Sequence, residues 1–420
     1  MNPNLWAILS SSQHNWHSVS SISNEMKACY QIAFPLIQFL NFQYDDHSSH
    51  YKIYHIAQSL LKTRPAKLVF IDHSPAPFLL LKILNQISPD YLPELTLHLY
   101  GNFFHHFEYY YREQQLLKNY PCRITAASLS HLKLLKSCCL STQKIYKFPF
   151  PTQVNQWRYN PELGKDFRKK HQITDQEHVI IFHGRKSMQK NTLGLLHFFS
   201  RLVDRLENVK LLILGDFDES SPNYFSHYFC RKHGFFYQCF KHEIEKLPLN
   251  VQNKILDFYH LSQIETHHAL CAADLFISPS LHHYEDFGLA PLEALSSGLP
   301  SILTQWGGHN DYLENFPLAH KIEVSLSHQG LQLNWDKALS SIHELIKSPV
   351  SVTERDESYQ LAERLYSKES LSKNLQEIYQ FPALAFQGFA SQYLSLNRNT
   401  IDNTTHPIYN QHISHFLLKD

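Results

Sequence analysis

Two glutamates, Glu285 and Glu293, stand eight positions apart, on either side of an expected helix start. Pro291 is favoured in a first helical turn, and Gly298, followed by a proline, is typical of a helix end. Glu285 therefore falls on the loop, and Glu293 falls about one turn inside the helix. An acid near a reacting group and an acid that can hold hydroxyl groups would together suit a sugar nucleotide.

The loop between these glutamates offers backbone hydrogen-bond donors. The amides of Phe287, Gly288 and Leu289 are expected to point out of the helix N-terminus. Unpaired N–H groups and the helix dipole make such an end an anion site. The segment therefore predicts a phosphate site beside Glu285.

A basic loop earlier in the chain is the second candidate. Gly184 lets the backbone turn after an expected strand, and Arg185 and Lys190 follow on the same loop. An arginine fork and a lysine point charge could clamp a diphosphate and stabilise the charge of a departing nucleotide diphosphate. Basic loops are more often simply solvated, so the prediction depends on the Glu285 segment lying in the same domain.

Both halves of the chain alternate apolar runs with helical stretches. Strands are expected near 5–9, 67–71, 95–99, 123–127, 178–182, 209–214, 275–277 and 301–303. Such alternation predicts parallel sheets covered by helices on both faces. The expected fold class is α/β, with two Rossmann-like domains that face a central cleft and bind ligands at the carboxyl ends of their strands.

The segment Phe148-Pro149-Phe150-Pro151 breaks this pattern and marks a domain boundary. The expected divisions are an N-terminal domain over 1–150, a linker over 151–175 and a C-terminal domain over 176–385. Residues 386–420 form a remaining tail that could pack back on the N-terminal domain.

Composition narrows the function classes. The 420 residues are 43% hydrophobic and carry zero net charge, which argues against nucleic acid as the main partner. No apolar run reaches the ~18 residues needed to span a membrane, and the N-terminus lacks a basic signal region. Seven cysteines without metal spacing suit a reducing cytoplasm. The 29 histidines fall partly in adjacent pairs, whose side chains diverge, so no metal site is expected.

Together these features resemble the retaining glycosyltransferases of the group 1 family (glycosyltransferase family 4), which have the GT-B fold. The similarity runs over about 179–313 and includes the 184–190 loop, the 285–293 segment and the pair Gly307-Gly308. The N-terminal half matches only in strand order, which is typical of the acceptor side. The resemblance implies transfer of a sugar from a nucleotide-sugar donor to a hydroxyl of a glycan or lipid-linked acceptor, in cell-surface polysaccharide or glycoconjugate synthesis.

The resemblance also implies roles for the donor-side residues. Arg185 and Lys190 look like the pair that binds the donor pyrophosphate. Glu293 looks like the acid that holds the ribose hydroxyls, and Glu285 looks like the acid that contacts the donor sugar near its reacting carbon. The family usually needs no metal, so the nucleotide-sugar is the only small molecule expected.

The remaining implied roles concern backbone and a histidine. The backbone over 287–289 looks like the stretch that lies over phosphate and sugar. His98, at the end of an expected strand, looks like the histidine that faces the donor sugar, and His73 is its rival. The first loop, 10–15, lacks the paired glycines of many relatives, and Asn191 replaces the usual glycine after Lys190.

The family's stereochemistry favours same-face attack, in which the leaving phosphate helps to deprotonate the acceptor hydroxyl. Glu285 as a covalent nucleophile is the alternative mechanism. Two alternative functions remain on the same fold: a sugar phosphorylase or epimerase, and a non-catalytic partner subunit.

The stretch 121–150 contains no acidic residue and five cations: Arg123, Lys133, Lys136, Lys144 and Lys147. One interpretation is a helix on the inner membrane face that reaches a lipid-linked acceptor. The other is an amphipathic helix that covers the sheet and keeps its lysines in water. The aromatic run 103–111 likewise suits either an acceptor surface or a packed core.

Overall fold

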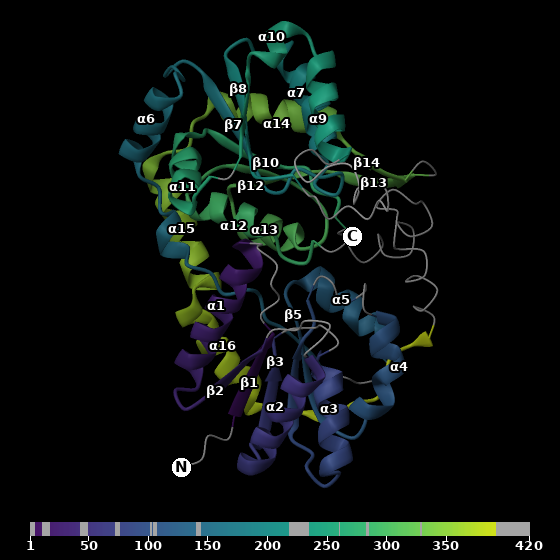
Figure 1. Ribbon diagram of the computed structural model, residues 1–420. Helices are drawn as coiled ribbons and strands as arrows, with labels where there is room; N and C mark the ends of the chain where they lie inside the picture. Colours follow the sequence, from purple (N-terminus) through teal and green to yellow (C-terminus); the bar gives the residue numbers. More distant parts are fainter. Residues whose placement is uncertain are drawn as a thin grey trace. The chain divides into compact units, whose positions relative to one another are not determined.

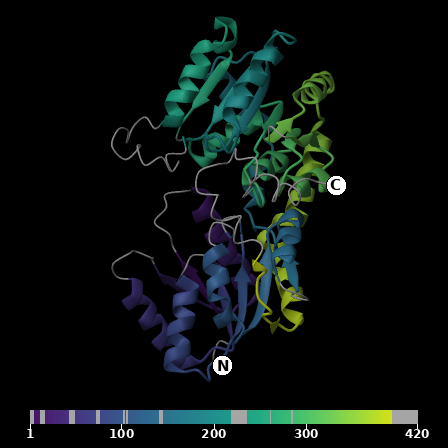
Figure 2. The same ribbon diagram turned by 90° about the vertical axis from the view of Figure 1, so that its right-hand side faces the viewer.

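The computed structural model describes residues 5–10, 17–42, 49–71, 76–100, 103, 107–139, 144–217, 235–259, 261–282, 285–327 and 330–391. These residues form two compact units. Unit 1 contains the described residues up to Gln153 together with those from Leu365 onward, and unit 2 contains Val154–Arg364. In each unit helices flank a sheet (Figures 1 and 2).

Unit 1 is built on a sheet whose described strands run in the order β15-β5-β4-β3-β1-β2, with β6 paired to β5. All pairings are parallel except that of β15 with β5. The strands are β1 (Leu5–Ser10), β2 (Gln38–Phe42), β3 (Lys67–Phe70), β4 (Glu94–His98), β5 (Pro121–Ala126), β6 (Ile145–Lys147) and β15 (Leu384–Ala385). The helices are α1 (His17–Ala33), α2 (Ser49–Thr63), α3 (Ala76–Ile87), α4 (Phe107–Leu117), α5 (Leu129–Cys138) and α16 (Lys368–Gln380).

Unit 2 is built on a parallel sheet whose described strands run in the order β12-β11-β10-β7-β8-β9. The strands are β7 (His178–His183), β8 (Val209–Leu214), β9 (Ile255–Phe258), β10 (Leu275–Ser278), β11 (Ser301–Thr304) and β12 (Ala319–Ile322). The helices are α6 (Pro161–Lys170), α7 (Thr192–Val203), α9 (Phe235–Lys246), α10 (Leu249–Gln252), α11 (Gln263–Ala272), α12 (Leu289–Ser296), α13 (His309–Asn315), α14 (Trp335–Lys347) and α15 (Val352–Tyr366). A hairpin of β13 (Val324–Ser327) and β14 (Gly330–Leu333) follows β12.

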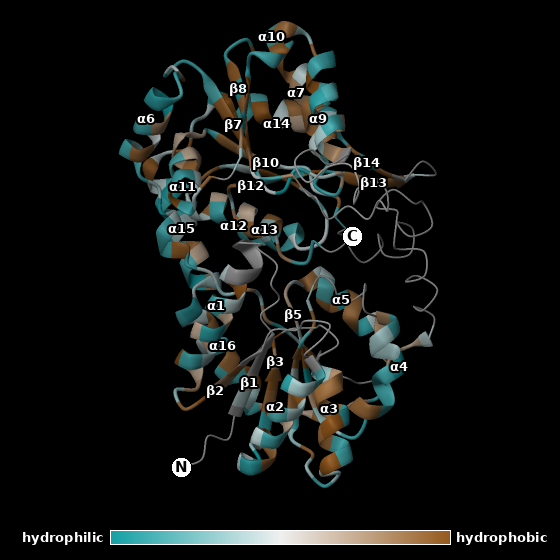
Figure 3. Ribbon diagram, in the orientation of Figure 1, coloured by the Kyte–Doolittle hydropathy of each residue, from teal (hydrophilic) through white to brown (hydrophobic). Residues whose placement is uncertain are grey.

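The apolar runs explain the strands of unit 2. A parallel strand covered on both faces must be apolar along its whole length rather than at alternate positions. Four consecutive apolar residues are buried in each of two strands, Val179 to Phe182 in β7 and Leu211 to Leu214 in β8, so both faces are covered. Figure 3 shows β7 and β8 as hydrophobic, whereas α6 is largely hydrophilic. The predicted α/β class with two Rossmann-like domains is confirmed.

The boundaries of the units differ from the predicted ones. Over 151–175 the chain forms a short 3-10 turn (Val154–Trp157) and α6, which belong to unit 2 and are not a linker. Helix α6 crosses α11 at Gly164, where an added Cβ would lie 2.4 Å from the carbonyl oxygen of Cys271. Only glycine permits that approach.

The C-terminal boundary also differs, because unit 2 ends at Arg364 and not at 385. Helix α16 packs against α1 in unit 1, and Gln376 donates to the carbonyl oxygen of Ala33 at 2.9 Å. Residues 386–391 continue in unit 1, where Phe389 is buried. The rest of the predicted tail lies outside the described residues.

Helix α5 has the pattern of an amphipathic helix that covers a sheet. Leu134 and Leu135 are buried, whereas Lys133 and Lys136 are exposed. Arg123 does not belong to any basic surface, since it is buried in an ion pair with Glu94. Among the described helices, none combines the length and apolar character that crossing a bilayer demands.

The described part of the aromatic run packs inside unit 1. Phe103, Phe107 and Tyr110 are buried, and each has a ring contact with Phe389. This arrangement matches the core interpretation of the run. Residues 104–106 and the glycine-free loop over 11–15 lie outside the described residues.

Candidate functional site

The basic loop begins at the carboxyl edge of the unit 2 sheet. Gly184, directly after β7, has φ +152°, and Gly215, directly after β8, has φ +122°. A Cβ on Gly215 would lie 2.3 Å from the carbonyl oxygen of Gly184. The loops after β7 and β8 therefore meet backbone to backbone, and the half-buried Arg185 follows at this edge.

The same loop orients Lys190. The Lys190 amide donates to Ser187 Oγ at 3.2 Å, and the Thr192 hydroxyl donates to the Ser187 carbonyl at 3.2 Å. Asn191 has φ +54° and lies in the left-handed region just before α7. Asparagine tolerates that region, so the change from glycine costs little.

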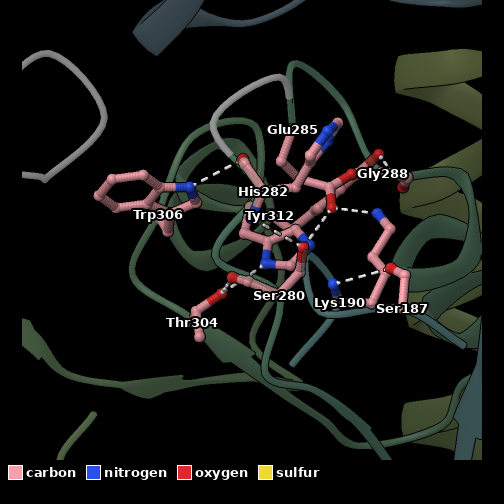
Figure 4. Close-up of polar contacts among 10 residues, drawn as sticks. Ser187, Lys190, Ser280, His282, Glu285, Gly288, Thr304, Trp306 and Tyr312 are labelled. Atoms are coloured by element: carbon pink, nitrogen blue, oxygen red, sulfur yellow. Dashed lines mark hydrogen bonds and ion pairs between the residues drawn. The ribbon is translucent and has the colours of Figure 1, made fainter. Parts of the chain in front are cut away.

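Lys190 and Glu285 form an ion pair that joins the two predicted groups (Figure 4). Ser280 Oγ donates to the same carboxylate oxygen, Oε2, at 2.7 Å. Residues 95 positions apart thus meet at one point, although Ser280 had no place in the sequence prediction. Both contacts fall on Oε2, which leaves Oε1 without a hydrogen-bond donor among the described side chains.

The environment keeps Glu285 ionised. Burial alone would raise the pKa of its carboxyl, but Lys190, followed by His309 and His282, holds that pKa well below its ordinary value. Burial lowers the pKa of His309 to about 4, against the opposing effect of Glu285. Since His309 is then neutral near pH 7, Lys190 is the main charge partner of Glu285 there.

The segment before α13 closes against Glu285. The Gly308 amide donates to the Glu285 carbonyl at 2.6 Å, and a Cβ on Gly307 would lie 2.3 Å from the same oxygen. His309 follows, fully buried, with Nδ1 at 3.0 Å from Thr304 Oγ1. The paired glycines were the sequence signal for this contact, but nothing in the sequence indicated His309.

The N-terminus of α12 has the features of an anion site. The helix starts at Leu289, its N-cap Gly288 has φ +87°, and no side chain caps it. Tyr312 donates to the Gly288 carbonyl at 3.0 Å, and its ring meets that of the buried Phe287 at 5.7 Å between centroids. The start of α12 is therefore fixed while its amides keep the polarity that favours a phosphate.

Glu293 lies on α12, about one turn after Leu289. Its Oε2 lies 3.1 Å from Nδ1 of His183, the last residue of β7. The Glu293 side chain is 18% exposed and the His183 side chain is 25% exposed. A partly exposed acid at the carboxyl edge of the sheet can accept hydrogen bonds from ligand hydroxyls.

His98 lies inside unit 1, and its burial there argues against the predicted role of facing a donor sugar. It is 1% exposed. Its Nε2 contacts Tyr30 Oη at 2.6 Å, and its Nδ1 contacts Thr125 Oγ1 at 2.7 Å and Tyr100 Oη at 2.9 Å. Both ring nitrogens are engaged, and burial lowers the pKa of His98 to about 3. The rival, His73, lies outside the described residues.

The site offers cations to a phosphate. Arg185 and Lys190 lie on one loop, and the N-cap of α12, Gly288, makes no side-chain cap. Within the described residues, no cluster of three or more His, Cys, Asp or Glu side chains could hold a metal ion.

The part of the chain that contains this site is similar to known proteins. Residues 165–332 match the family model described as glycosyl transferases group 1. Over 161 residues the chain is 26% identical to an uncharacterized glycosyltransferase of Methanocaldococcus jannaschii. The aligned region makes up 37% of this chain and 35% of that protein. The chain thus matches about a third of the length of this curated relative.

Solved structures show the fold of the whole described chain. HepE from Anabaena, in complex with UDP-glucose, superposes with a TM-score of 0.62 at 13% identity, over 90% of this chain and 99% of that one. A glycosyltransferase from Rickettsia africae superposes with a TM-score of 0.64 at 17% identity, over 90% and 98%. Identities this low establish the fold, which is GT-B.

Proposed function

We propose that this protein transfers a sugar from a nucleotide-sugar donor to a hydroxyl group, with retention of the anomeric configuration, because residues 165–332 match the family model of group 1 glycosyltransferases. The observation that carries the proposal is the contact of Lys190 with Glu285 beside the uncapped start of α12. A cation, an ionised acid and a helix N-terminus at one sheet edge match the parts of a sugar nucleotide.

Each group has a separate task. Arg185 and Lys190 bind the diphosphate, together with the amides at the start of α12. Glu285 accepts a hydrogen bond from a hydroxyl of the donor sugar at Oε1, since Lys190 and Ser280 already bind Oε2. Glu293 accepts hydrogen bonds from the ribose hydroxyls.

In the reaction the acceptor oxygen bonds to the anomeric carbon as the bond from that carbon to the diphosphate oxygen breaks. The acceptor's proton passes to the leaving phosphate on the same face of the sugar. Arg185 and Lys190 stabilise the charge that grows on the diphosphate, and Glu285, held ionised, stabilises the electron-poor sugar. The acceptor we propose is a hydroxyl of a glycan or of a lipid-linked sugar.

A thermal-shift screen tests the donor class. UDP-, GDP-, ADP- and CDP-sugars are added to the wild type and to Glu293→Ala, with UDP-glucose first because HepE was solved with it. One nucleotide family should raise the melting temperature of the wild type by a few degrees, and the variant should lose most of that shift. The matched control is Glu344→Ala, an exposed acid on α14, which should behave as the wild type. No shift with any donor would contradict the proposal.

A further inference from the structure

A histidine to which the sequence prediction gave no role lies against the expected ribose ligand. His183 Nδ1 and Glu293 Oε2 are 3.1 Å apart, and neither atom is exposed to solvent. Neither atom has a hydrogen bond in the described part of the chain, to the other atom or to any third group. The pair is thus a close contact of an imidazole nitrogen and a carboxylate oxygen at hydrogen-bonding distance, with neither atom satisfied elsewhere.

The backbone holds this histidine rigidly. His183 pairs with Leu214 of β8, and the next residue, Gly184, donates its amide to the Leu214 carbonyl at 3.0 Å. The imidazole thus projects from a paired strand end with two rotatable bonds. Glu293 has three rotatable side-chain bonds and would lose more rotamer entropy if a ligand alone had to order it.

We propose that His183 is a positioning residue: its Nδ1–H holds Oε2 of Glu293, turns Oε1 toward the nucleotide ribose and so sets a preference for ribonucleotide over deoxyribonucleotide donors. The inference rests on the proposed function, because it takes Glu293 as the ribose ligand. It adds a role for His183 and a specificity that the sequence prediction did not assign.

A fixed Glu293 carboxylate would favour ribose over deoxyribose for a chemical reason. A carboxylate that accepts a ribose hydroxyl gains a hydrogen bond to a charged group, and a deoxyribose leaves that oxygen desolvated and unpaired. The penalty requires a carboxylate that cannot turn away. Without the His183 contact, Glu293 can rotate toward water, and both kinds of sugar are then bound about equally.

The test compares dissociation constants for matched nucleotides by calorimetry. The probes are UDP, GDP, ADP and CDP with their 2′-deoxy and 3′-deoxy forms, on the wild type, His183→Ala and His183→Asn. The wild type should prefer its ribonucleotide by about 10- to 100-fold over at least one deoxy form. His183→Ala should reduce that preference to about threefold or less. His183→Asn should keep most of it, because its amide N–H falls near the position of Nδ1.

Two further variants separate positioning from folding. His183→Gln places its amide near Nε2 instead and should lose the preference, even if His183→Ala fails to fold. His343→Ala, an exposed histidine on α14, should leave all constants unchanged.

The outcomes are distinct. An unchanged ribose preference in both His183→Ala and His183→Gln would overturn the positioning role, as would equal weakening of ribo and deoxy forms in all three His183 variants. A wild type that binds none of the four nucleotides would instead overturn the proposed function.

Discussion

The ion pair of Lys190 and Glu285 shows what single residues could and could not reveal in advance. Both stand in loops after apolar runs, so their placement at a sheet edge was predictable from the sequence. Their direct contact was not, because it depends on how two loops 95 residues apart are aimed at each other. His309 and His183 were missed for a related reason: an isolated histidine at a strand or helix end carries no signal of its burial or its partners.

His98 illustrates the opposite error. Its position at a strand end was predicted correctly, since it closes β4. Its side chain, however, points into a network with Tyr30, Tyr100 and Thr125. Which face of a strand end meets the core depends on the packing of distant elements, here α1 and β5, and not on local sequence.

His98 should make folding pH-dependent. Its pKa is about 3 in the folded state and near 6.5 when unfolded. The unfolded state therefore binds the extra proton, and stability falls as pH decreases from about 6.5 to about 3, by up to about 1.4 kcal/mol per pH unit. Urea unfolding measured from pH 7.5 to 4.5 gives the free energy of unfolding as a function of pH. That free energy should fall less steeply in His98→Gln than in the wild type, by the equivalent of about one proton taken up on unfolding. The control His55→Gln, at an exposed position of α2, should keep the wild-type slope, and equal slopes in all three proteins would contradict the account.

Among the elements, the loop after β7 is tied to β9 by a buried charge. The Lys186 side chain is fully buried in an ion pair with Asp257, its Nζ donates to the Phe258 carbonyl at 3.2 Å, and it lies 3.8 Å from the centroid of the Tyr259 ring. Burial lowers the pKa of Lys186, and Asp257 opposes that effect. These contacts attach the loop that carries Arg185 to the end of β9.

Breaking this pair should destabilise unit 2. Lys186→Met leaves Asp257 with Lys241, at 3.4 Å, as its remaining cationic partner among the described residues. The expected loss is about 3 kcal/mol of unfolding free energy, and the double variant Lys186→Met/Asp257→Asn should recover part of it. Denaturant unfolding measures both. Lys165→Met, which removes an exposed pair on α6, is the control, and a Lys186→Met loss no larger than that of the control would refute the role.

Other elements were only partly predictable. The start of α6 has local signals, an Asn160 cap and Pro161 in the first turn. The packing of α6 on α11 has no local signal, because it depends on the close approach of Gly164 to the backbone of Cys271. A segment that looks like a linker in sequence can therefore be a packed helix.

At the scale of the whole molecule, alternation of strands and helices was enough to predict two α/β units. The tail from 386 was expected to pack back on the N-terminal domain, but the alternation could not predict that the return to unit 1 begins at Leu365, because the contact of α16 with α1 joins residues more than 300 positions apart. Pairing that remote has no local periodicity. The donor-side unit was predictable in more detail because its motifs lie close together along the chain.

The central claim is that unit 2 binds and activates a nucleotide-sugar. The direct measurement is release of nucleoside diphosphate from the donor found by screening, with its dissociation constant, for the wild type, Glu293→Ala and Arg185→Ala. Arg201→Ala, at an exposed pair with Asp336, is the control. Glu293→Ala should weaken donor binding about tenfold or more, and Arg185→Ala should lower turnover about 100-fold with a smaller change in binding. Binding and turnover equal to the wild type in both variants would contradict the account.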